Sequence, residues 1–198
     1  MATVRSAEII IGEGITEEYY FSSLRDVLVV KPRTKSLKPY NMKELEVAIK
    51  DYAGKGYTKI HCLIDMDNKV STPENMKQYQ RLKQKYHHKR VKNTDCEVCF
   101  YESYPSIELF FYYYFESSTA EKTNEGLKSW LKHKCGYDTS ERYLSKSSLH
   151  KTFIGKDGCL EDAIHHAKDS VRLREGDTYH CSYTEIGELI ETLGVKTV

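Results

Sequence analysis

The sequence predicts an α/β fold, in which helices flank a mostly parallel sheet and a mainly helical part follows. Short apolar runs without helical periodicity alternate with longer segments of helical pattern, and this alternation is typical of parallel sheets. The chain has 198 residues, of which 39% are hydrophobic and 30% charged, so it can bury a sizeable core and is neither disordered nor fibrous. We expect one domain over residues 1–198, with the core at about 5–118 and a helical C-terminal extension at about 119–198.

Three apolar segments are predicted to form buried strands. Each is short, two are rich in β-branched residues, and clusters of Gly, Asp, Asn, Ser or Pro follow them, as is usual where a strand leaves a sheet. The predicted strands are Ala7–Ile11, Thr58–Ile64 and Glu97–Tyr101.

The predicted helices are recognised by the residues that begin and end them. Thr16 is expected to cap a helix that runs to about Val30, and Asn41 with Glu44 resembles a capping pair that opens the next helix, which ends near Gly54. A loop is expected at Lys31–Lys38. Further helices are predicted at Pro73–Arg90, Ile107–Glu116, Glu121–Lys134, Cys159–Leu173 and Thr184–Leu193.

Charge and hydropathy favour a cytoplasmic protein without a membrane span. The chain carries 30 Lys and Arg against 29 Asp and Glu, so any basic surface has to be local. The longest apolar run, Leu109–Phe115, is far shorter than the roughly 20 residues that a bilayer requires. The N-terminus lacks the apolar core of a secretory signal, and the six cysteines are expected to be free thiols.

Acidic residues follow the first two predicted strands. Glu13 comes after the first strand, and Asp65 and Asp67 come after the second. Residues i and i+2 of an extended segment project to the same side, so the two aspartates are expected to converge, and a parallel neighbour would bring Glu13 beside them. A hard cation such as Mg²⁺ relieves the repulsion in such a cluster and suits phosphoryl chemistry. The alternative is that Asp65, Asp67 and Asn68 are turn and capping residues.

The segments around these acids resemble the RloB-like family of Toprim-domain proteins. The family pattern is matched by Glu13-Gly14, Thr16-Glu17 and Tyr20-Phe21, and the Toprim signature of a Glu and an Asp-x-Asp falls on Glu13, Asp65 and Asp67. A third family segment appears as Tyr104-Pro105-Ser106-Ile107-Glu108-Leu109-Phe110. The resemblance covers nearly the whole chain.

This resemblance implies a Toprim-like, Rossmann-like sandwich that uses Mg²⁺ or Mn²⁺. It implies a nuclease that acts on DNA or RNA, tRNA included, as an effector in bacterial defence against phage, beside an ATPase partner of the OLD or ABC type. The catalytic residues would be Glu13, Asp65, Asp67, Glu108 and Lys146, with Lys151 nearly as good a candidate for the lysine. The metal would be held by Glu13, Asp65 and Asp67, with Glu17 as a supporting residue or as a favourable charge at a helix start.

Two further features suggest binding partners. The basic helix from Lys77 to Arg90 carries Tyr79 and Tyr86, a mixture that suits a phosphate backbone with stacked bases, although a charged helix is more often a solvated face. The aromatic run Phe110–Phe115 would cover every side of a helix and is expected to pack in the core or against a second copy in a homodimer.

Three other patterns are set aside. Cys96 and Cys99 resemble half of a zinc site, to be completed by His133 and Cys135, but residues three apart on a strand face opposite ways. The adjacent histidine pairs, His87-His88 and His165-His166, are expected to lie on helices, where neighbouring side chains point apart and cannot hold one metal ion together. Gly12-x-Gly14 lacks the third glycine of a dinucleotide site.

Two alternatives to a nuclease remain. The domain could be a non-catalytic module that binds metal and nucleotide or a partner ATPase. A phosphatase of the haloacid-dehalogenase type also begins with Asp-x-Asp, but there the motif follows the first strand and does not continue as Asn68-Lys69.

Overall fold

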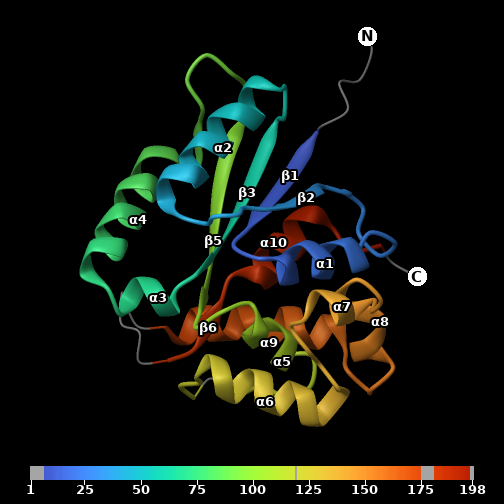
Figure 1. Cartoon of the computed structure of the whole chain (residues 1–198). Helices are drawn as coiled ribbons and strands as arrows, with labels where there is room; N and C mark the ends of the chain where they lie inside the picture. Colours follow the sequence, from blue (N-terminus) through green and yellow to red (C-terminus); the bar gives the residue numbers. More distant parts are fainter. Residues whose placement is uncertain (1–6, 119, 175–180, 197–198) are drawn as a thin grey trace.

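The computed structural model describes residues 7–118, 120–174 and 181–196, and in this part the chain forms an α/β fold around a six-stranded sheet (Figure 1). The strand order is β2-β1-β3-β5-β4, and β6 pairs with β5. The first four strands of this order are parallel, whereas β4 and β6 are antiparallel to β5. The strands are β1 (Glu8–Gly12), β2 (Arg33–Ser36), β3 (Lys59–Asp65), β4 (Lys89–Arg90), β5 (Glu97–Tyr104) and β6 (Tyr183–Thr184).

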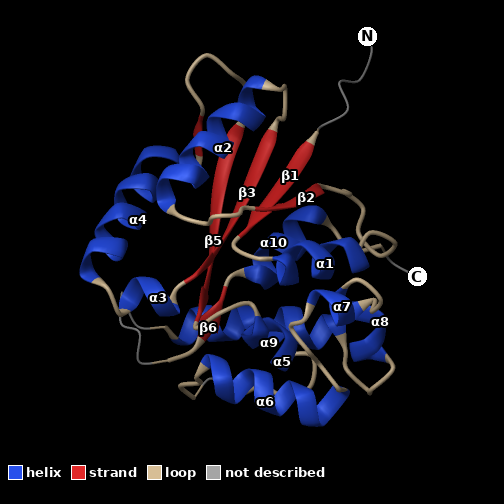
Figure 2. Ribbon diagram, viewed as in Figure 1, coloured by secondary structure: helices blue, strands red, loops and turns tan. Residues whose placement is uncertain are grey.

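Helices cover both faces of the sheet. Figure 2 shows α2 and α4 on one side of the strands and α1 and α10 on the other, with the remaining C-terminal helices gathered beyond the end of the sheet. The helices are α1 (Ile15–Ser23), α2 (Met42–Gly54), α3 (Asp67–Val70), α4 (Pro73–Tyr86), α5 (Glu108–Tyr112), α6 (Asn124–Cys135), α7 (Glu141–Leu144), α8 (Leu149–Ile154), α9 (Leu160–Leu173) and α10 (Ile186–Leu193).

Two hydrophobic clusters hold these layers together. Side chains alternate along each strand, so Ile10 enters the cluster beneath α1, α5, α9 and α10, while Ile9 and Ile11 enter the cluster beneath α2 and α4. Because both faces are buried, the parallel strands can be apolar at nearly every position. The mostly parallel sheet flanked by helices is therefore confirmed.

The strand order creates a switch point between β1 and β3. From β1 the chain passes through α1 to β2 on one side, and it then returns through α2 to β3 on the other side of β1. The chain leaves β1 into α1 on one face of the sheet and leaves β3 toward α4 on the other face, and binding sites of parallel sheets are commonly found at such a switch point, beyond the carboxyl ends of the strands. Glu13 and Asp65 stand at those two ends.

The aromatic helix α5 packs within its own chain. Its residues Leu109 to Tyr112, and the turn residues Tyr113 and Tyr114, are all at least nine-tenths buried in the cluster that faces α1 and α9. The hydroxyl of Tyr114 lies 2.9 Å from the hydroxyl of Tyr20 and 3.1 Å from His150 Nδ1. Phe110 to Tyr114 therefore pack in the core, as one of the two interpretations of the aromatic run expected, while Phe115 is partly buried against the same cluster.

Several predicted boundaries are wrong because tertiary contacts override local pattern. The first helix ends at Ser23 rather than near Val30, and Leu28 instead forms a bridge with Val195. The segment predicted as a loop, 31–38, contains β2, which pairs with the open edge of β1.

The second half of the chain also differs in detail from the prediction. The helix that Pro73 begins ends at Tyr86, four residues earlier than predicted, and β5 runs three residues further, to Tyr104. The C-terminal part contains β6 as well as helices, and the short helices α7 and α8 were not predicted. The cap at Asn41 is confirmed, since its Oδ1 accepts from the backbone N–H groups of Lys43 and Glu44.

Two predictions about the class of protein can be compared with the structure. None of the helices in the described part of the chain combines the length and the apolar character that a membrane span needs. All six cysteines are unpaired, as predicted.

Candidate acidic functional site

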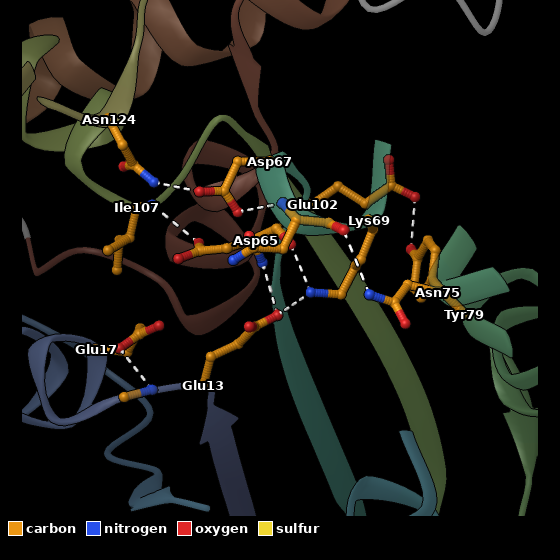
Figure 3. Close-up of polar contacts among 12 residues, drawn as sticks. Glu13, Glu17, Asp65, Asp67, Lys69, Asn75, Tyr79, Glu102, Ile107 and Asn124 are labelled. Atoms are coloured by element: carbon orange, nitrogen blue, oxygen red, sulfur yellow. Dashed lines mark hydrogen bonds and ion pairs between the residues drawn. The ribbon is translucent and has the colours of Figure 1, made fainter. Parts of the chain in front are cut away.

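Five acidic residues lie near the switch point, and Figure 3 shows four of them, Glu13, Glu17, Asp65 and Asp67. Glu13 follows β1, Asp65 is the last residue of β3 and Asp67 is the first of α3. Glu17 lies in the first turn of α1, and Glu108 is the first residue of α5. The structure therefore brings together all of the acidic residues that were predicted for the site.

Glu13 and Asp65 are joined directly. The backbone N–H of Asp65 donates to Glu13 Oε1 at 3.0 Å. The Lys69 ammonium group donates to the same oxygen and to the backbone oxygen of Asp65, the latter at 2.6 Å. Lys69 is only 5% exposed, so its charge acts within the cluster and not in solvent. Burial raises the pKa of Glu13, although the Lys69 charge opposes that shift.

Glu17 is the most deeply buried acid of the group, with 3% exposure. Its Oε2 accepts from the backbone N–H of Gly14 at 3.2 Å, which caps the start of α1. Burial, with the nearby charges of Glu108 and Glu13, raises the pKa of Glu17 to about 8. A Cβ added at Gly12 would lie 2.7 Å from the Cβ of Glu17, so glycine at this position lets α1 approach the strand end.

Asp65 ties β3 to the start of α5. Its Oδ1 accepts from the backbone N–H of Ile107 at 3.1 Å, and the backbone N–H groups of Met66 and Asp67 donate to Pro105 O. Burial raises the pKa of Asp65 well above its usual value, and the charges of Glu17, Glu13 and Glu108 add to the shift. The carboxylate thus stands in a polar but poorly solvated place.

Glu108 is held by neutral hydroxyl groups. Ser106 donates to its Oε2 at 2.7 Å and Tyr137 donates to its Oε1 at 3.0 Å. The Lys128 ammonium group lies 3.7 Å from Oε1, and the Lys128 side chain is 44% exposed whereas Glu108 is 4% exposed. Glu108 therefore enters the cluster as a fixed carboxylate on the α5 side.

The side chain of Asp67 does not point to the same side as that of Asp65, as it would if Asp65-Met66-Asp67 were an extended segment. Met66 between the two aspartates has helical backbone angles and Asp67 opens α3, so the assumed i, i+2 geometry is wrong. Asp67 Oδ1 accepts from the Asn68 N–H at 2.6 Å, as the turn interpretation expected, and Oδ2 accepts from Asn124 Nδ2. Asp67 lies at the edge of the cluster, between α3 and α6 (Figure 3).

The lysine of the site is not one of the two that were predicted. Lys146 lies on the turn after α7 and Lys151 lies on α8, and both side chains are exposed. Among the described residues, the ammonium groups that contact these carboxylates belong to Lys69 and Lys128. Lys69 follows Asp65 by four residues, and α3 turns its side chain back toward the end of β3, so recognising this short helix in the sequence would have indicated Lys69. No local pattern in the sequence indicates that Asn124 contacts Asp67.

A buried hydroxyl group without a partner also faces the cluster. The hydroxyl of Tyr40 makes no hydrogen bond in the described structure, and the Lys69 ammonium group lies 5.5 Å from the centre of its ring. Burial, with the charges of Glu13 and Asp65 among its neighbours, raises the pKa of Tyr40 well above its usual value. Tyr40 therefore keeps its proton and can donate it in a hydrogen bond to a phosphate oxygen or a water.

The donor set suits a hard divalent cation that keeps several waters. Carboxylate oxygens are the ligands that Mg²⁺ and Mn²⁺ prefer, and Mg²⁺ commonly takes one or two of them with water and substrate phosphate. Within residues 7–118, 120–174 and 181–196, no three of these carboxylate oxygens lie within 4.8 Å of one another. Direct ligation by Glu13 and Asp65, with the other acids acting through water, fits this spacing.

The basic helix offers less to nucleic acid than its sequence suggested. Tyr79 and Tyr86 are 2% and 5% exposed and pack in the core, so they cannot stack on bases. Lys83 pairs with the buried Glu102, and Lys85 pairs with Glu46. The prediction of interleaved aromatic contacts is therefore wrong for α4.

The cysteine and histidine patterns have a mixed outcome. Cys96 and Cys99 pack in the two different hydrophobic clusters, which confirms that they face opposite ways. His87 and His88 lie beyond the end of α4 with ring centres 3.9 Å apart, so the expectation that they point apart on a helix is wrong.

Comparison with known proteins identifies the family of the chain. No curated protein and no solved structure matches it. The family model described as RloB-like protein matches residues 9–193, which include the sheet, the acidic cluster and α10. The chain therefore belongs to the family of RloB-like proteins.

Proposed function

We propose that this protein is a metal-dependent nuclease that hydrolyses phosphodiester bonds of DNA or RNA. The observation that carries the proposal is the convergence of Glu13, Glu17, Asp65 and Glu108 at the switch point of a parallel sheet, with Asp67 at the edge. So many carboxylates in a poorly solvated place raise one another's pKa, and a divalent cation removes that cost.

The position of each side chain suggests its role in the proposed hydrolysis. Glu13 and Asp65 would hold Mg²⁺ or Mn²⁺, which supplies an activated water and neutralises charge on the phosphate. Glu13, whose side chain is 20% exposed, would either ligate that ion or accept the proton of an attacking water. Lys69, which now pairs with Glu13, and Tyr40 would donate hydrogen bonds to the phosphate oxygens once Glu13 faces the cation.

The first experiment is a cleavage assay on plasmid DNA, single-stranded DNA and tRNA with Mg²⁺, Mn²⁺ or EDTA. The wild type is compared with Glu13→Gln and Asp65→Asn, and with Glu44→Gln, an exposed carboxylate of α2, as the matched control. We expect metal-dependent cleavage in the wild type and the control and none in the two site variants. Cleavage that persists in EDTA, or in both site variants, would contradict the proposal.

A second candidate is a non-catalytic module that binds metal and nucleotide or a partner ATPase. It is favoured by one observation: the Lys69 charge and a protonated Glu17 already neutralise part of the cluster without a metal. In that case Asp65→Asn would lower stability or partner binding, and no substrate of the panel would be cut by the wild type.

The cellular role is proposed on family membership together with the motif. We infer a sheet of Toprim type, since a Glu follows β1 and acidic residues follow β3, and a cytoplasmic effector of phage defence that works beside an ATPase. The test is the plating efficiency of phage on cells that express the wild type or Asp65→Asn, each alone and together with a candidate ATPase partner. Equal plating on both strains would argue against the defence role.

A further inference from the structure

A second group of potential metal ligands lies at the opposite end of the sheet from the acidic cluster. His88 Nδ1 lies 3.7 Å from Cys99 Sγ and 3.7 Å from Glu97 Oε1, and Cys99 Sγ lies 3.9 Å from the same Glu97 oxygen. Glu97 pairs with Lys59 at the start of β3, whereas Asp65 ends that strand. The two places are thus separated by the length of β3.

The β4–β5 pairing brings these three side chains together. Glu97 and Cys99 are two apart on β5, so their side chains share one face of the sheet. The antiparallel register pairs Lys89 with Val98, which sets His88 beside Cys99, and the His88 N–H donates to Val98 O at 2.8 Å. Because α4 ends at Tyr86, His88 is free to adopt the φ of 54° that this position requires.

The three distances are close to those of a tetrahedral zinc site. With metal–ligand bonds of about 2.0–2.1 Å to nitrogen and oxygen and about 2.3 Å to sulfur, ligand atoms at tetrahedral angles stand roughly 3.4–3.6 Å apart. The observed separations of 3.7, 3.7 and 3.9 Å exceed these by a few tenths of an ångström. Small side-chain rotations would close that gap.

Neighbouring groups already orient two of the ligands. The other oxygen of Glu97, Oε2, lies 3.9 Å from the Lys59 ammonium group, which leaves Oε1 toward His88 and Cys99. The ring of His87 contacts that of His88 at an angle of 39°, and His87 Nδ1 accepts from the Phe100 N–H at 3.0 Å. Burial lowers the pKa of His87 to about 4, so this supporting ring stays neutral at physiological pH.

The third ligand, Cys99, is buried, whereas the other two are partly exposed. Cys99 is 2% exposed, while His88 and Glu97 have side chains 61% and 41% exposed, so the group opens to solvent on one side only. Burial also raises the pKa of the Cys99 thiol. The thiol is therefore protonated without a metal, and an incoming cation has to displace that proton to water.

We propose that His88, Glu97 and Cys99 bind one Zn²⁺ ion, with a water molecule from the open side as the fourth ligand. Sulfur and imidazole nitrogen favour zinc over Mg²⁺, so this site is chemically separate from the all-oxygen cluster around Asp65. The bound ion would link the segment that follows α4 to β5 and so stabilise this edge of the sheet. This inference does not depend on the nuclease proposal.

Cobalt substitution with the full-length protein gives the most direct test. A thiolate bound to Co²⁺ gives a charge-transfer band in the near ultraviolet, which an all-oxygen site cannot give, and Zn²⁺ then displaces it. The variants are His88→Asn, Glu97→Gln and Cys99→Ser. Asparagine tolerates the left-handed backbone at position 88 and removes an exposed side chain, so His88→Asn keeps the core intact. The controls are Cys159→Ser, a partly exposed thiol elsewhere, and Asp65→Asn.

The expected result is a thiolate band that saturates at one equivalent of thiolate-bound Co²⁺ per chain in the wild type and both controls, whatever Co²⁺ the all-oxygen cluster takes up besides. His88→Asn and Cys99→Ser should lose the band and weaken Zn²⁺ binding by at least about 100-fold, more than the loss of an orienting neighbour alone costs. Zinc should raise the melting temperature of the wild type but not of His88→Asn. A wild type without the band, or a band that survives in both variants, overturns the proposal.

Discussion

Lys69 donates to Glu13 across the ends of two neighbouring strands, although the two residues are 56 positions apart in the chain. The same ammonium group holds the backbone oxygen of Asp65, so a buried cation occupies the cluster where a metal is proposed. Lys69 therefore stabilises the metal-free cluster and competes with a divalent cation for Glu13. This competition gives the first prediction.

Replacing Lys69 with methionine should raise the affinity for a divalent cation but lower the stability of the metal-free protein. Without the ammonium group, Glu13 is free to bind the cation, so the affinity for Mn²⁺ should rise by about 10-fold or more, as measured by calorimetry. The metal-free variant should lose about 3 kcal/mol of unfolding free energy, at the low end for a broken buried pair because Glu13 can take up a proton. Unchanged Mn²⁺ affinity would show that Lys69 does not compete at the site.

A methyl group at Gly12 should disturb the site through Glu17. The added Cβ would lie 2.7 Å from the Glu17 Cβ, so Gly12→Ala should cost about 1–3 kcal/mol and lower cleavage. Gly54, the last residue of α2, has no atom within 4 Å of an added Cβ. Gly54→Ala should therefore be neutral or gain up to about 1 kcal/mol, and chemical denaturation of both variants provides the comparison.

Stability in EDTA should fall as the pH rises toward 8, in part because of Glu17. Its pKa rises from 4.5 in the unfolded chain to about 8 in the folded protein, so the folded state binds more protons over that interval and loses stability with rising pH. Glu17→Gln keeps an acceptor for the Gly14 N–H but does not titrate. The pH profile of the unfolding free energy should be flatter in the variant; parallel profiles would contradict the assignment.

Glu102 should show the opposite pH dependence. It is 3% exposed and bonded to Lys83, Tyr79 and Tyr183, and although burial acts to raise its pKa, the Lys83 charge and these bonds lower it overall. Its contribution is present above its unfolded pKa near 4.5 and is lost as the pH falls below that value.

Glu102→Gln should therefore cost about 3 kcal/mol at pH 7 and less at pH 3, as measured by denaturant unfolding at both pH values. Glu121→Gln, an exposed carboxylate, is the control and should be close to neutral at both. An equal loss for Glu102→Gln at pH 3 and pH 7 would mean that its charge does not matter.

The two lysines suggested by family resemblance should not matter for cleavage. Lys146 and Lys151 are exposed, and the cluster takes its amines from Lys69 and Lys128. We expect Lys146→Ala and Lys151→Ala to cleave at the wild-type rate in the metal-dependent assay, while Lys69→Met cleaves more slowly. A loss of cleavage confined to Lys146→Ala would instead assign the lysine as the resemblance suggested.

The sequence predicted the features that depend on short-range pattern. Apolar runs located β1, β3 and β5, and the Asn41 side chain marked the start of α2, because strand burial and capping are decided within a few residues. The positions of Glu13 and Asp65 at strand ends followed from the same pattern, and parallel pairing then implied that they meet.

Only the tertiary structure decided which groups complete each site. Lys69 enters the acidic cluster because a short helix follows β3, and Asn124 reaches Asp67 from a helix 57 residues away. His88 meets Cys99 because α4 stops early and β4 pairs with β5. These contacts form only when segments that are distant in the chain pack against or pair with one another. The free energy that holds such segments together comes from the whole fold, so a local sequence pattern does not predict the contacts.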